Sequence, residues 1–230
     1  MIEHGYIKPA LRRLRPYTTF TFAGMQVASK PHLDGGGSSF GQEFIPLLRK
    51  RGMPKQARAF EWCAGPGFIG FSLLAHGLCE SLCLADVNPE AVEACRRTVR
   101  TNALEGRVSF YQSDNLASIP LTEQWDLVVG NPPHFLDEGI GQLRYSDPHW
   151  TIHRSFFANI HRHLKADGVI VLQENNRRTT PDTFAPMIAE AGLRIVFVQN
   201  AAPQPTRDDQ YFFLGIMRAG DTPPEWASAR

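Results

Sequence analysis

Apolar strand patterns alternate with helix patterns over most of the chain, and this alternation limits the possible folds more than any other feature. Helix patterns cover residues 68–76, 89–103, 150–164 and 181–191. Strand patterns cover residues 57–63, 81–86, 107–112, 125–129, 169–173, 195–198 and 211–217. Apolar strands separated by helices are typical of a parallel sheet that is covered on both faces. The sequence predicts an α/β fold with a doubly wound, mainly parallel sheet of seven strands.

The two ends of the chain depart from this alternation. No helix separates the last two strand patterns, so they should form an antiparallel hairpin. Residues 1–38 show no regular pattern, and a helix is expected over residues 40–51. We therefore predict two parts: an N-terminal arm and helix (residues 1–56) that cover the functional site, and a main domain (residues 57–230) that carries it.

Composition narrows the class of protein. Of the 230 residues, 43% are hydrophobic and 20% are charged, which is typical of globular domains. No apolar run approaches the ~18 residues that span a membrane, and residues 1–5 are not of signal-peptide type. We expect a cytoplasmic protein, monomeric or homodimeric, without a membrane partner. Its four cysteines (Cys63, Cys79, Cys83, Cys95) suit reduced thiols and form no metal-binding pattern.

Positive charge is concentrated near the N-terminus. Residues 1–60 hold ten Lys and Arg against three Asp and Glu, whereas residues 61–230 hold 14 against 20. Such an arm can attract nucleic acid, or it can form a solvated face against an acidic body. The second interpretation is preferred, because the net charge of the chain is only +1.

Ligands on parallel sheets bind at the carboxyl ends of the strands, so the residues after each strand are the candidate site. After the first strand comes Gly65-Pro66-Gly67-Phe68-Ile69-Gly70, a glycine-rich turn that opens a helix. After the second comes Asp86, 21 residues beyond Gly65, where a carboxylate can accept ribose hydroxyls. Together the two signals predict an adenosine-containing ligand.

The third and fourth strands end in two further polar segments. Asp114, after the third strand, either accepts a hydrogen bond from an adenine amino group or forms an Asx-type turn. Asn131-Pro132-Pro133-His134 follows the fourth strand. The two prolines favour an extended backbone, which leaves the Asn131 side-chain carbonyl and the Pro132 backbone carbonyl as two acceptors for a substrate NH2 group.

These motifs together resemble the class I methyltransferases that use S-adenosyl-L-methionine (SAM), of the small methyltransferase domain type. The likeness covers residues 57–218 and implies a Rossmann-like, SAM-binding catalytic domain. The Asn-Pro-Pro segment is similar to that of N-methyltransferases acting on release-factor glutamine or on RNA or DNA bases. One position departs from that subfamily, because His134 stands where an aromatic residue usually follows the second proline.

The resemblance implies roles for individual residues. Asn131 and Pro132 would hold the nitrogen nucleophile, and Asn131 would also border the cofactor. His134 and His149 are candidate bases, and Tyr145 is a candidate substrate contact in the irregular stretch 134–150, with Asp147 and Trp150. Tyr17, Phe20 and Phe22 could form the other wall or simply pack on the body. The implied SAM-binding residues are Glu61, Cys63, Gly65, Gly67, Asp86, Val87, Asp114 and Asn115.

The predicted activity is methyl transfer from SAM to a nitrogen of a small molecule or a protein side chain. One alternative is a cyclase that consumes SAM itself, forming azetidine-2-carboxylate and releasing methylthioadenosine. Another is N-methylation of an RNA or DNA base, which the basic arm favours and the absence of an appended nucleic-acid domain disfavours. A nicotinamide dehydrogenase and a non-catalytic SAM-binding module leave Asn131-Pro132-Pro133 unexplained. His161 and His163 are expected to be solvent-exposed rather than metal ligands.

Overall fold

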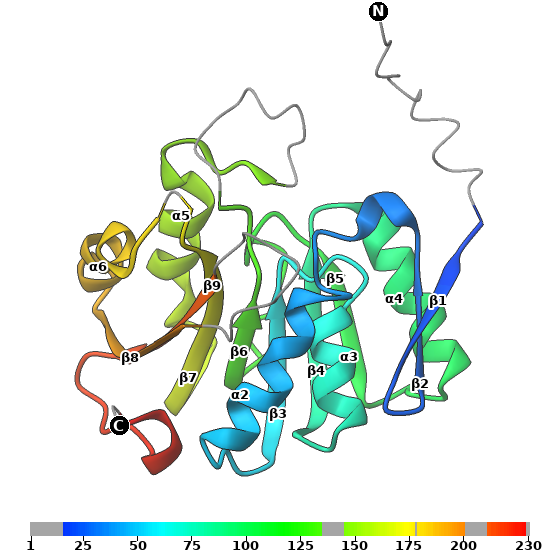
Figure 1. The fold of residues 1–230 in the computed structure, drawn as a ribbon, viewed down its shortest axis with the longest axis horizontal. Coiled ribbons are helices and arrows are strands. Elements are labelled where there is room, and N and C mark those ends of the chain that lie inside the picture. Colours follow the sequence, from blue (N-terminus) through cyan, green and yellow to red (C-terminus); the bar gives the residue numbers. More distant parts are fainter. Residues whose placement is uncertain (1–15, 135–144, 178, 201–210, 229–230) are drawn as a thin grey trace, which may run out of the picture.

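A computed structural model describes residues 16–134, 145–177, 179–200 and 211–228. Its main sheet has seven strands in the order β5-β4-β3-β6-β7-β9-β8 (Figure 1). These strands are β3 (Gln56–Trp62), β4 (Cys79–Asp86), β5 (Val108–Gln112), β6 (Trp125–Gly130), β7 (Leu164–Asn175), β8 (Leu193–Asn200) and β9 (Tyr211–Arg218). The predicted α/β fold is confirmed.

Strands β5, β4, β3, β6 and β7 run parallel, whereas β9 is antiparallel to both β7 and β8. The predicted C-terminal antiparallel hairpin is therefore present, and its second strand is inserted between β7 and β8. The parallel strands all end at one edge of the sheet, which places the residues after β3, β4, β5 and β6 near one another.

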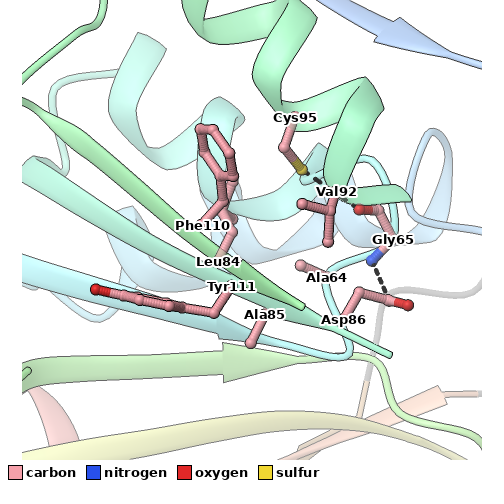
Figure 2. Close-up of a pocket in the computed structure, with 9 residues that line it drawn as sticks. All are labelled: Ala64, Gly65, Leu84, Ala85, Asp86, Val92, Cys95, Phe110 and Tyr111. Atoms are coloured by element: carbon pink, nitrogen blue, oxygen red, sulfur yellow. Dashed lines mark hydrogen bonds between the residues drawn. The ribbon is translucent and has the colours of Figure 1, made fainter. Parts of the chain in front are cut away.

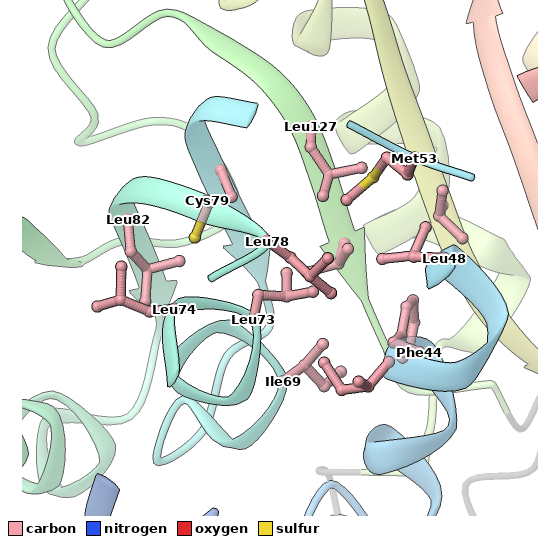
Figure 3. Packing of buried hydrophobic residues seen from close by; sticks show 14 of the residues in the cluster. Phe44, Leu48, Met53, Ile69, Leu73, Leu74, Leu78, Cys79, Leu82 and Leu127 are labelled. Carbon is pink, nitrogen blue, oxygen red and sulfur yellow. The ribbon is translucent and has the colours of Figure 1, made fainter. Parts of the chain in front are cut away.

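Helices cover both faces of the sheet (Figure 1). One apolar cluster joins α2 (Phe44–Lys50), α3 (Phe68–Ala75) and α4 (Pro89–Thr101) to one face, and Figure 3 shows part of its packing. A second cluster joins α5 (Thr151–Ile160) and α6 (Pro181–Glu190) to the other face. Within the described residues, no helix is both long and apolar enough to cross a bilayer.

Helix boundaries follow local signals. Asn88 caps α4 by accepting a hydrogen bond from the Glu90 N–H, and Pro89 occupies the first helical position, where no N–H is needed. Helix α5 ends at Ile160, earlier than the expected residue 164, because Leu164 already pairs with Trp125 as the first residue of β7. The expected helix over 40–51 is a 3-10 turn (Phe40–Glu43) followed by α2.

The expectation that residues 1–38 are irregular is wrong for part of that segment. Strands β1 (Thr18–Phe22) and β2 (Met25–Ser29) form an antiparallel hairpin. Its two-residue turn has positive φ at Ala23 and Gly24, a geometry that suits the right-handed twist of a hairpin. A 3-10 turn (Pro31–Leu33) follows the hairpin.

The hairpin packs on the body of the domain. Phe20 and Phe22 contact the Phe68 ring edge-on, with centroids 5.0 and 5.9 Å away, and the Ala28 N–H donates to Thr98 Oγ1 at 3.0 Å. The Tyr17 ring lies 4.3 Å from the Arg97 guanidinium. These aromatic residues therefore pack on α3 and α4, which is the simpler of the two roles considered for them.

Several basic residues of the first sixty pair with acids of the body. Lys30 pairs with Glu90, Lys55 with Glu80 and Arg58 with Glu123. Arg51 is buried and donates to the Trp226 and Ser228 carbonyls near the chain end, beside a final 3-10 turn (Glu225–Ala227). Lys8, Arg12, Arg13 and Arg15 lie outside the described residues. These contacts support the preferred interpretation of a basic face against an acidic body.

Candidate active site

The glycine-rich turn and the end of β4 are joined by one carboxylate. Asp86 Oδ2 accepts a hydrogen bond from the Gly65 N–H at 2.7 Å, and its Oδ1 accepts one from the Asn88 N–H at 2.8 Å (Figure 2). Burial raises the pKa of Asp86, against the effect of these two N–H donors. Each carboxylate oxygen retains a second lone pair, so Asp86 can still accept hydroxyl donors.

A small hollow lies between these residues and α4. Figure 2 shows that side chains of α4, β4 and β5 meet there with the glycine-rich turn. Its lining is mostly apolar and consists of Ala64, Gly65, Leu84, Ala85, Asp86, Val92, Cys95, Phe110 and Tyr111. The hollow has no room for a water molecule, so it marks an apolar surface beside Asp86 and not a preformed nucleoside cavity.

Both glycines of the turn adopt positive φ, at +52° for Gly65 and +82° for Gly67. A Cβ on Gly67 would lie 2.7 Å from the Phe71 ring, so only glycine fits where α3 begins. A Cβ on Gly65 would lie 3.3 Å from the Leu33 carbonyl oxygen, so that carbonyl approaches the bare backbone closely. The lack of side chains on the turn thus allows other groups to approach its backbone closely.

Glu61 is buried beneath the start of α3. Its carboxylate accepts hydrogen bonds from the Ile69 N–H at 3.2 Å and from the Gly70 N–H at 2.7 Å. Burial raises the pKa of Glu61 to about 8, although the two N–H donors act in the opposite direction. Glu61 therefore fixes the position of the glycine-rich turn from below, by binding backbone N–H groups at the start of α3.

The other predicted cofactor residues occupy the same edge of the sheet. Val87 is 64% exposed directly after Asp86, and Asp114 is exposed after β5. Cys63 is half-buried with φ +52°, and burial raises the pKa of its thiol. Asn115 has φ +54° and donates through Nδ2 to the Ile152 carbonyl at 2.8 Å, so it ties the end of β5 to α5.

The Asn131–His134 segment leaves β6 beside the glycine-rich turn. Trp62 pairs with Gly130 across the parallel strands, so Cys63 and Asn131 are the next residues on adjacent strands. Asn131 is half-buried, whereas Pro132 and His134 are buried. His134 Nδ1 lies 3.0 Å from the Pro132 oxygen and must donate its proton there, because a carbonyl only accepts.

This last contact was not foreseen from the sequence, in which the Pro132 carbonyl was expected to be free for a substrate. His134 uses one of the two lone pairs of that oxygen. When the imidazole is neutral, the ring proton on Nδ1 leaves the lone pair on Nε2. The neighbouring backbone thus orients the His134 ring.

The residues before α2 lie close to both the glycine-rich turn and the Asn131–His134 segment. The Leu33 carbonyl lies close to Gly65, and a Cβ on Gly36 would lie 3.9 Å from Asn131 Nδ2. Asp34 folds this segment by accepting from the Gly36 N–H at 2.8 Å, and it also contacts the Ser38 hydroxyl. These contacts place residues 33–36 beside the site, and the role of residues 1–56 as its cover stays a prediction.

Residues 135–144 lie outside the described residues. The predicted substrate contacts that follow them differ in burial. Tyr145 is half-buried and His149 is exposed, so both remain candidates. Asp147 is fully buried and Trp150 is 8% exposed. The expectation that Asp147 and Trp150 contact substrate is therefore not supported, because both side chains are packed inside the protein.

His161 is exposed as expected, but the same expectation for His163 is wrong. His163 is 2% exposed, its Nδ1 donates to the Glu123 carbonyl at 2.9 Å, and its ring stacks on Trp125. The four cysteines form no disulfide in the described residues. Within that part of the chain, no three His, Cys, Asp or Glu side chains gather as a metal site.

Comparison with known proteins decides the family. The model of the family described as methyltransferase small domain matches residues 24–194, about three quarters of the chain. The chain belongs to this family. The predicted SAM-dependent transferase class, with SAM as cofactor, is confirmed at the level of the family.

Curated relatives match over shorter stretches. The chain is 35% identical over 112 residues to a ribosomal RNA small subunit methyltransferase C of Actinobacillus pleuropneumoniae, which is 49% of this chain and 31% of the relative. It is 31% identical over 80 residues to a release factor glutamine methyltransferase of Leptospira interrogans, which is 34% of this chain and 28% of the relative. The chain thus spans about a third of the length of these relatives.

Solved structures share the fold. A T. thermophilus 16S rRNA N2 G1207 methyltransferase in complex with AdoMet and guanosine aligns with a TM-score of 0.58 and 14% identity, covering 86% of this chain and 50% of that one. A Pyrococcus abyssi tRNA (uracil-54, C5)-methyltransferase in complex with S-adenosyl-L-homocysteine aligns with a TM-score of 0.60 and 18% identity, covering 88% and 45%.

The residues at the carboxyl edge fit the cofactor of this family. Asp86 carries carboxylate lone pairs for hydroxyl donors, and Gly65, which has no side chain, allows close approach to the turn. Apolar side chains beside Asp86, among them Val92 and Phe110, offer a surface for a flat base. No residue of the described hollow introduces a buried positive charge that would repel a sulfonium.

Proposed function

We propose that this methyltransferase domain transfers the methyl group of SAM to a nitrogen atom of its acceptor, held by Asn131 and Pro132. The observation that carries the proposal is the adjacency of β3 and β6: Trp62 pairs with Gly130, so the glycine-rich turn and the Asn131–Pro132 segment leave neighbouring strands at one edge. A cofactor at the first segment and an acceptor at the second would be neighbours.

We propose a division of labour between the residues. Asp86 would hold the ribose hydroxyls, Asp114 and Asn115 would lie towards the adenine, and Gly65 and Gly67 would pass beneath the methionyl part. Glu61 would keep that turn in place from below. Cys63 and Val87 would contact the cofactor from the ends of β3 and β4. These assignments rest on position at the carboxyl edge and on the resemblance in sequence.

SAM supplies a methyl group on a positively charged sulfur, which is already a strong electrophile. The protein must place a nitrogen lone pair in line with the sulfur–methyl bond, and positioning of this kind can contribute about 7–11 kcal/mol. An amide or a base amine delocalises that lone pair. Asn131 Oδ1 and the remaining lone pair of the Pro132 carbonyl would accept its two N–H bonds and orient it for attack.

The proton released by the nitrogen needs an acceptor. The Nδ1–H of His134 donates to the Pro132 carbonyl, which would leave Nε2 of the neutral ring as the basic atom. This arrangement favours His134 over His149, whose side chain is exposed and lies beyond the 135–144 stretch. Tyr145 would contact the acceptor rather than take its proton.

Two relatives support a nitrogen acceptor of this kind. One is a release factor glutamine methyltransferase, and the side chain of glutamine ends in an amide. The other is the solved 16S rRNA N2 G1207 methyltransferase, whose name gives N2 of a guanosine. Both nitrogens are NH2 groups on planar carbon. We propose an acceptor with such a group, in a small molecule or a protein side chain.

A base nitrogen of RNA is the second candidate acceptor, favoured by the match to a ribosomal RNA methyltransferase over 49% of this chain. Salt dependence separates the two candidates. An RNA acceptor bound through its phosphates would lose affinity steeply between low and physiological salt, whereas a glutamine-containing peptide or a small amide would not.

The test is incubation of the protein with isotopically labelled SAM and panels of acceptors: small amides and amines, glutamine-containing peptides, nucleosides and RNA. Mass spectrometry should find one labelled methyl group on a nitrogen of one class. A parallel incubation with SAM alone detects methylthioadenosine, the product of the cyclase alternative. Methylthioadenosine formation without any methylated acceptor would overturn the proposal.

A further inference from the structure

A buried ionic triad lies outside the groups assigned so far. His153 Nδ1 is 2.6 Å from Asp147 Oδ2, and His153 Nε2 is 3.1 Å from Glu174 Oε1. All three side chains are fully buried. They come from the segment before α5, from α5 itself and from the end of β7.

The histidine of the triad is held in its charged form. Burial alone would lower the pKa of His153, but the carboxylates of Glu174 and Asp147 raise it to about 9. Two carboxylates around one imidazolium leave a net negative charge in the core, and Glu174 Oε2 has no hydrogen-bond partner in the described structure. Such a group is a poor source of stability compared with apolar packing. A role in holding a particular geometry accounts for it better.

The triad holds the segment from Tyr145 to Trp150. Asp147 also accepts from the Ile152 N–H at 2.8 Å and from the His153 N–H at 3.0 Å, which fixes this segment to the start of α5. The Trp150 ring meets the His153 ring edge-on with centroids 5.4 Å apart. Both His149 and Trp150 have φ +57°, a conformation that costs energy and persists only where surrounding contacts impose it.

The triad also lies directly behind the acceptor side of the site. Strands β6 and β7 are paired up to Gly130 and Leu172, and two residues further along each strand are Pro132 and Glu174. The Trp62 ring, next to Gly130 on β3, meets the His153 ring edge-on at 5.4 Å. The triad therefore connects the end of β7, beside the Asn131–His134 segment, with the Tyr145–Trp150 segment.

From these contacts we infer that Asp147, His153 and Glu174 are positioning residues for methyl transfer: they fix Tyr145–Trp150 to the end of β7, the strand beside β6, and so set turnover without taking part in SAM binding. The inference rests on the proposed transfer to nitrogen. Misplacing a substrate-binding wall by about 1 Å can cost two orders of magnitude in rate, so a triad that never touches substrate can still govern kcat.

The test compares Glu174→Gln and His153→Gln with His163→Gln in the full chain. Glu174→Gln keeps an oxygen for His153 but removes the charge. His163 is a matched control, because it is also a buried histidine packed on a tryptophan, but it contacts Glu123 and Trp125 at the start of β6, the opposite end of that strand from Asn131. We measure SAM affinity by calorimetry, kcat and KM with the acceptor that the wild type methylates, and amide hydrogen exchange.

Glu174→Gln should lower kcat about tenfold or more while SAM affinity changes less than about twofold, and the amides of Trp150 to His153 should exchange faster. His163→Gln should leave kcat, SAM affinity and those exchange rates near wild type. Equal losses of SAM affinity and turnover in Glu174→Gln would overturn the inference. If the wild type methylates no nitrogen, the proposed function has failed, and unchanged exchange in Glu174→Gln and His153→Gln would separately overturn the triad's role.

Discussion

Asp86 accepts a hydrogen bond from the Gly65 N–H at 2.7 Å, and this contact couples two segments that are 21 residues apart in sequence. One carboxylate thereby orients the glycine-rich turn after β3 and, through its remaining lone pairs, presents acceptors at the end of β4. The two strongest motifs of the sequence are thus one structural unit. Two predictions follow from this contact, a third concerns pH, and a fourth concerns Asn131.

Asp86→Ala should weaken SAM binding by an order of magnitude or more, because hydrogen bonds to a charged acceptor are lost. The Gly65 N–H would lose its partner in the same variant, so the turn itself would loosen. Calorimetric titration with SAM measures the effect, and Glu105→Ala, an exposed acid away from the edge, is the control. Wild-type affinity in Asp86→Ala would remove Asp86 from the ribose site.

Gly65→Ala and Gly77→Ala form a matched pair. Both glycines have positive φ, so each substitution should lower the free energy of unfolding by about 1 kcal/mol through backbone strain. Only at Gly65 would the new Cβ meet a neighbour, Leu33 O at 3.3 Å, whereas nothing lies within 4 Å at Gly77. Denaturant titration should therefore give a somewhat larger loss in Gly65→Ala, and SAM affinity should fall only in that variant. Equal SAM affinity in the two variants would contradict this account of the turn.

The stability of the protein should fall as pH rises from about 6.5 to about 9. The pKa of His153 is raised to about 9 in the folded chain, so its contribution is fully present below its unfolded pKa and is lost as pH rises through the folded one. The effect should be roughly 2–3 kcal/mol in the free energy of unfolding. Glu61, whose pKa is raised to about 8, gives a fall of the same sign at lower pH.

Thermal or denaturant unfolding at several pH values measures this dependence, and His153→Gln separates the two groups. The variant should lose the share of the slope that His153 provides between about pH 6.5 and 9, and keep the share below about pH 8 that Glu61 provides. An unchanged slope in His153→Gln would mean that His153 is not charged in the folded protein.

The sequence predicted the sheet well because its signals are local and repeated. Short apolar strands such as Trp125–Gly130 and a capped helix such as α4, with Asn88 and Pro89 at its start, need little tertiary information. The residues after each strand could then be gathered at one edge by topology alone. The hairpin of β1 and β2 also had a signal, since Phe20 and Phe22 alternate with Thr before the Ala23-Gly24 turn, and it was overlooked.

Other features depend on contacts between distant segments and leave no local pattern. His163 is buried because Trp125, the first residue of β6, and Glu123, just before it, contact its ring. Asp147 is buried because His153 and the start of α5 take up its oxygens. The bond from His134 to the Pro132 carbonyl depends on the course of a proline-rich backbone. In each case, the sequence predicted that a polar side chain would face solvent or substrate.

Asn131→Ala should retain SAM binding and lose turnover, because its side chain is proposed to hold the acceptor nitrogen rather than the cofactor's ribose. Asn131→Asp keeps the acceptor oxygen and adds a charge, so it should retain more activity than alanine towards an amino group. Calorimetry with SAM and rates with the identified acceptor measure both effects. Full turnover in Asn131→Ala would place the nucleophile elsewhere.

The most direct test of the account is the fate of the methyl group. Purified protein is incubated with methyl-labelled SAM and the acceptor panel, and every labelled product is identified by mass spectrometry, with Asn131→Ala in parallel. The account predicts label on one nitrogen of one acceptor, and its loss in Asn131→Ala. Label on carbon or oxygen, or methylthioadenosine formed from SAM alone and no methylated product, would contradict it.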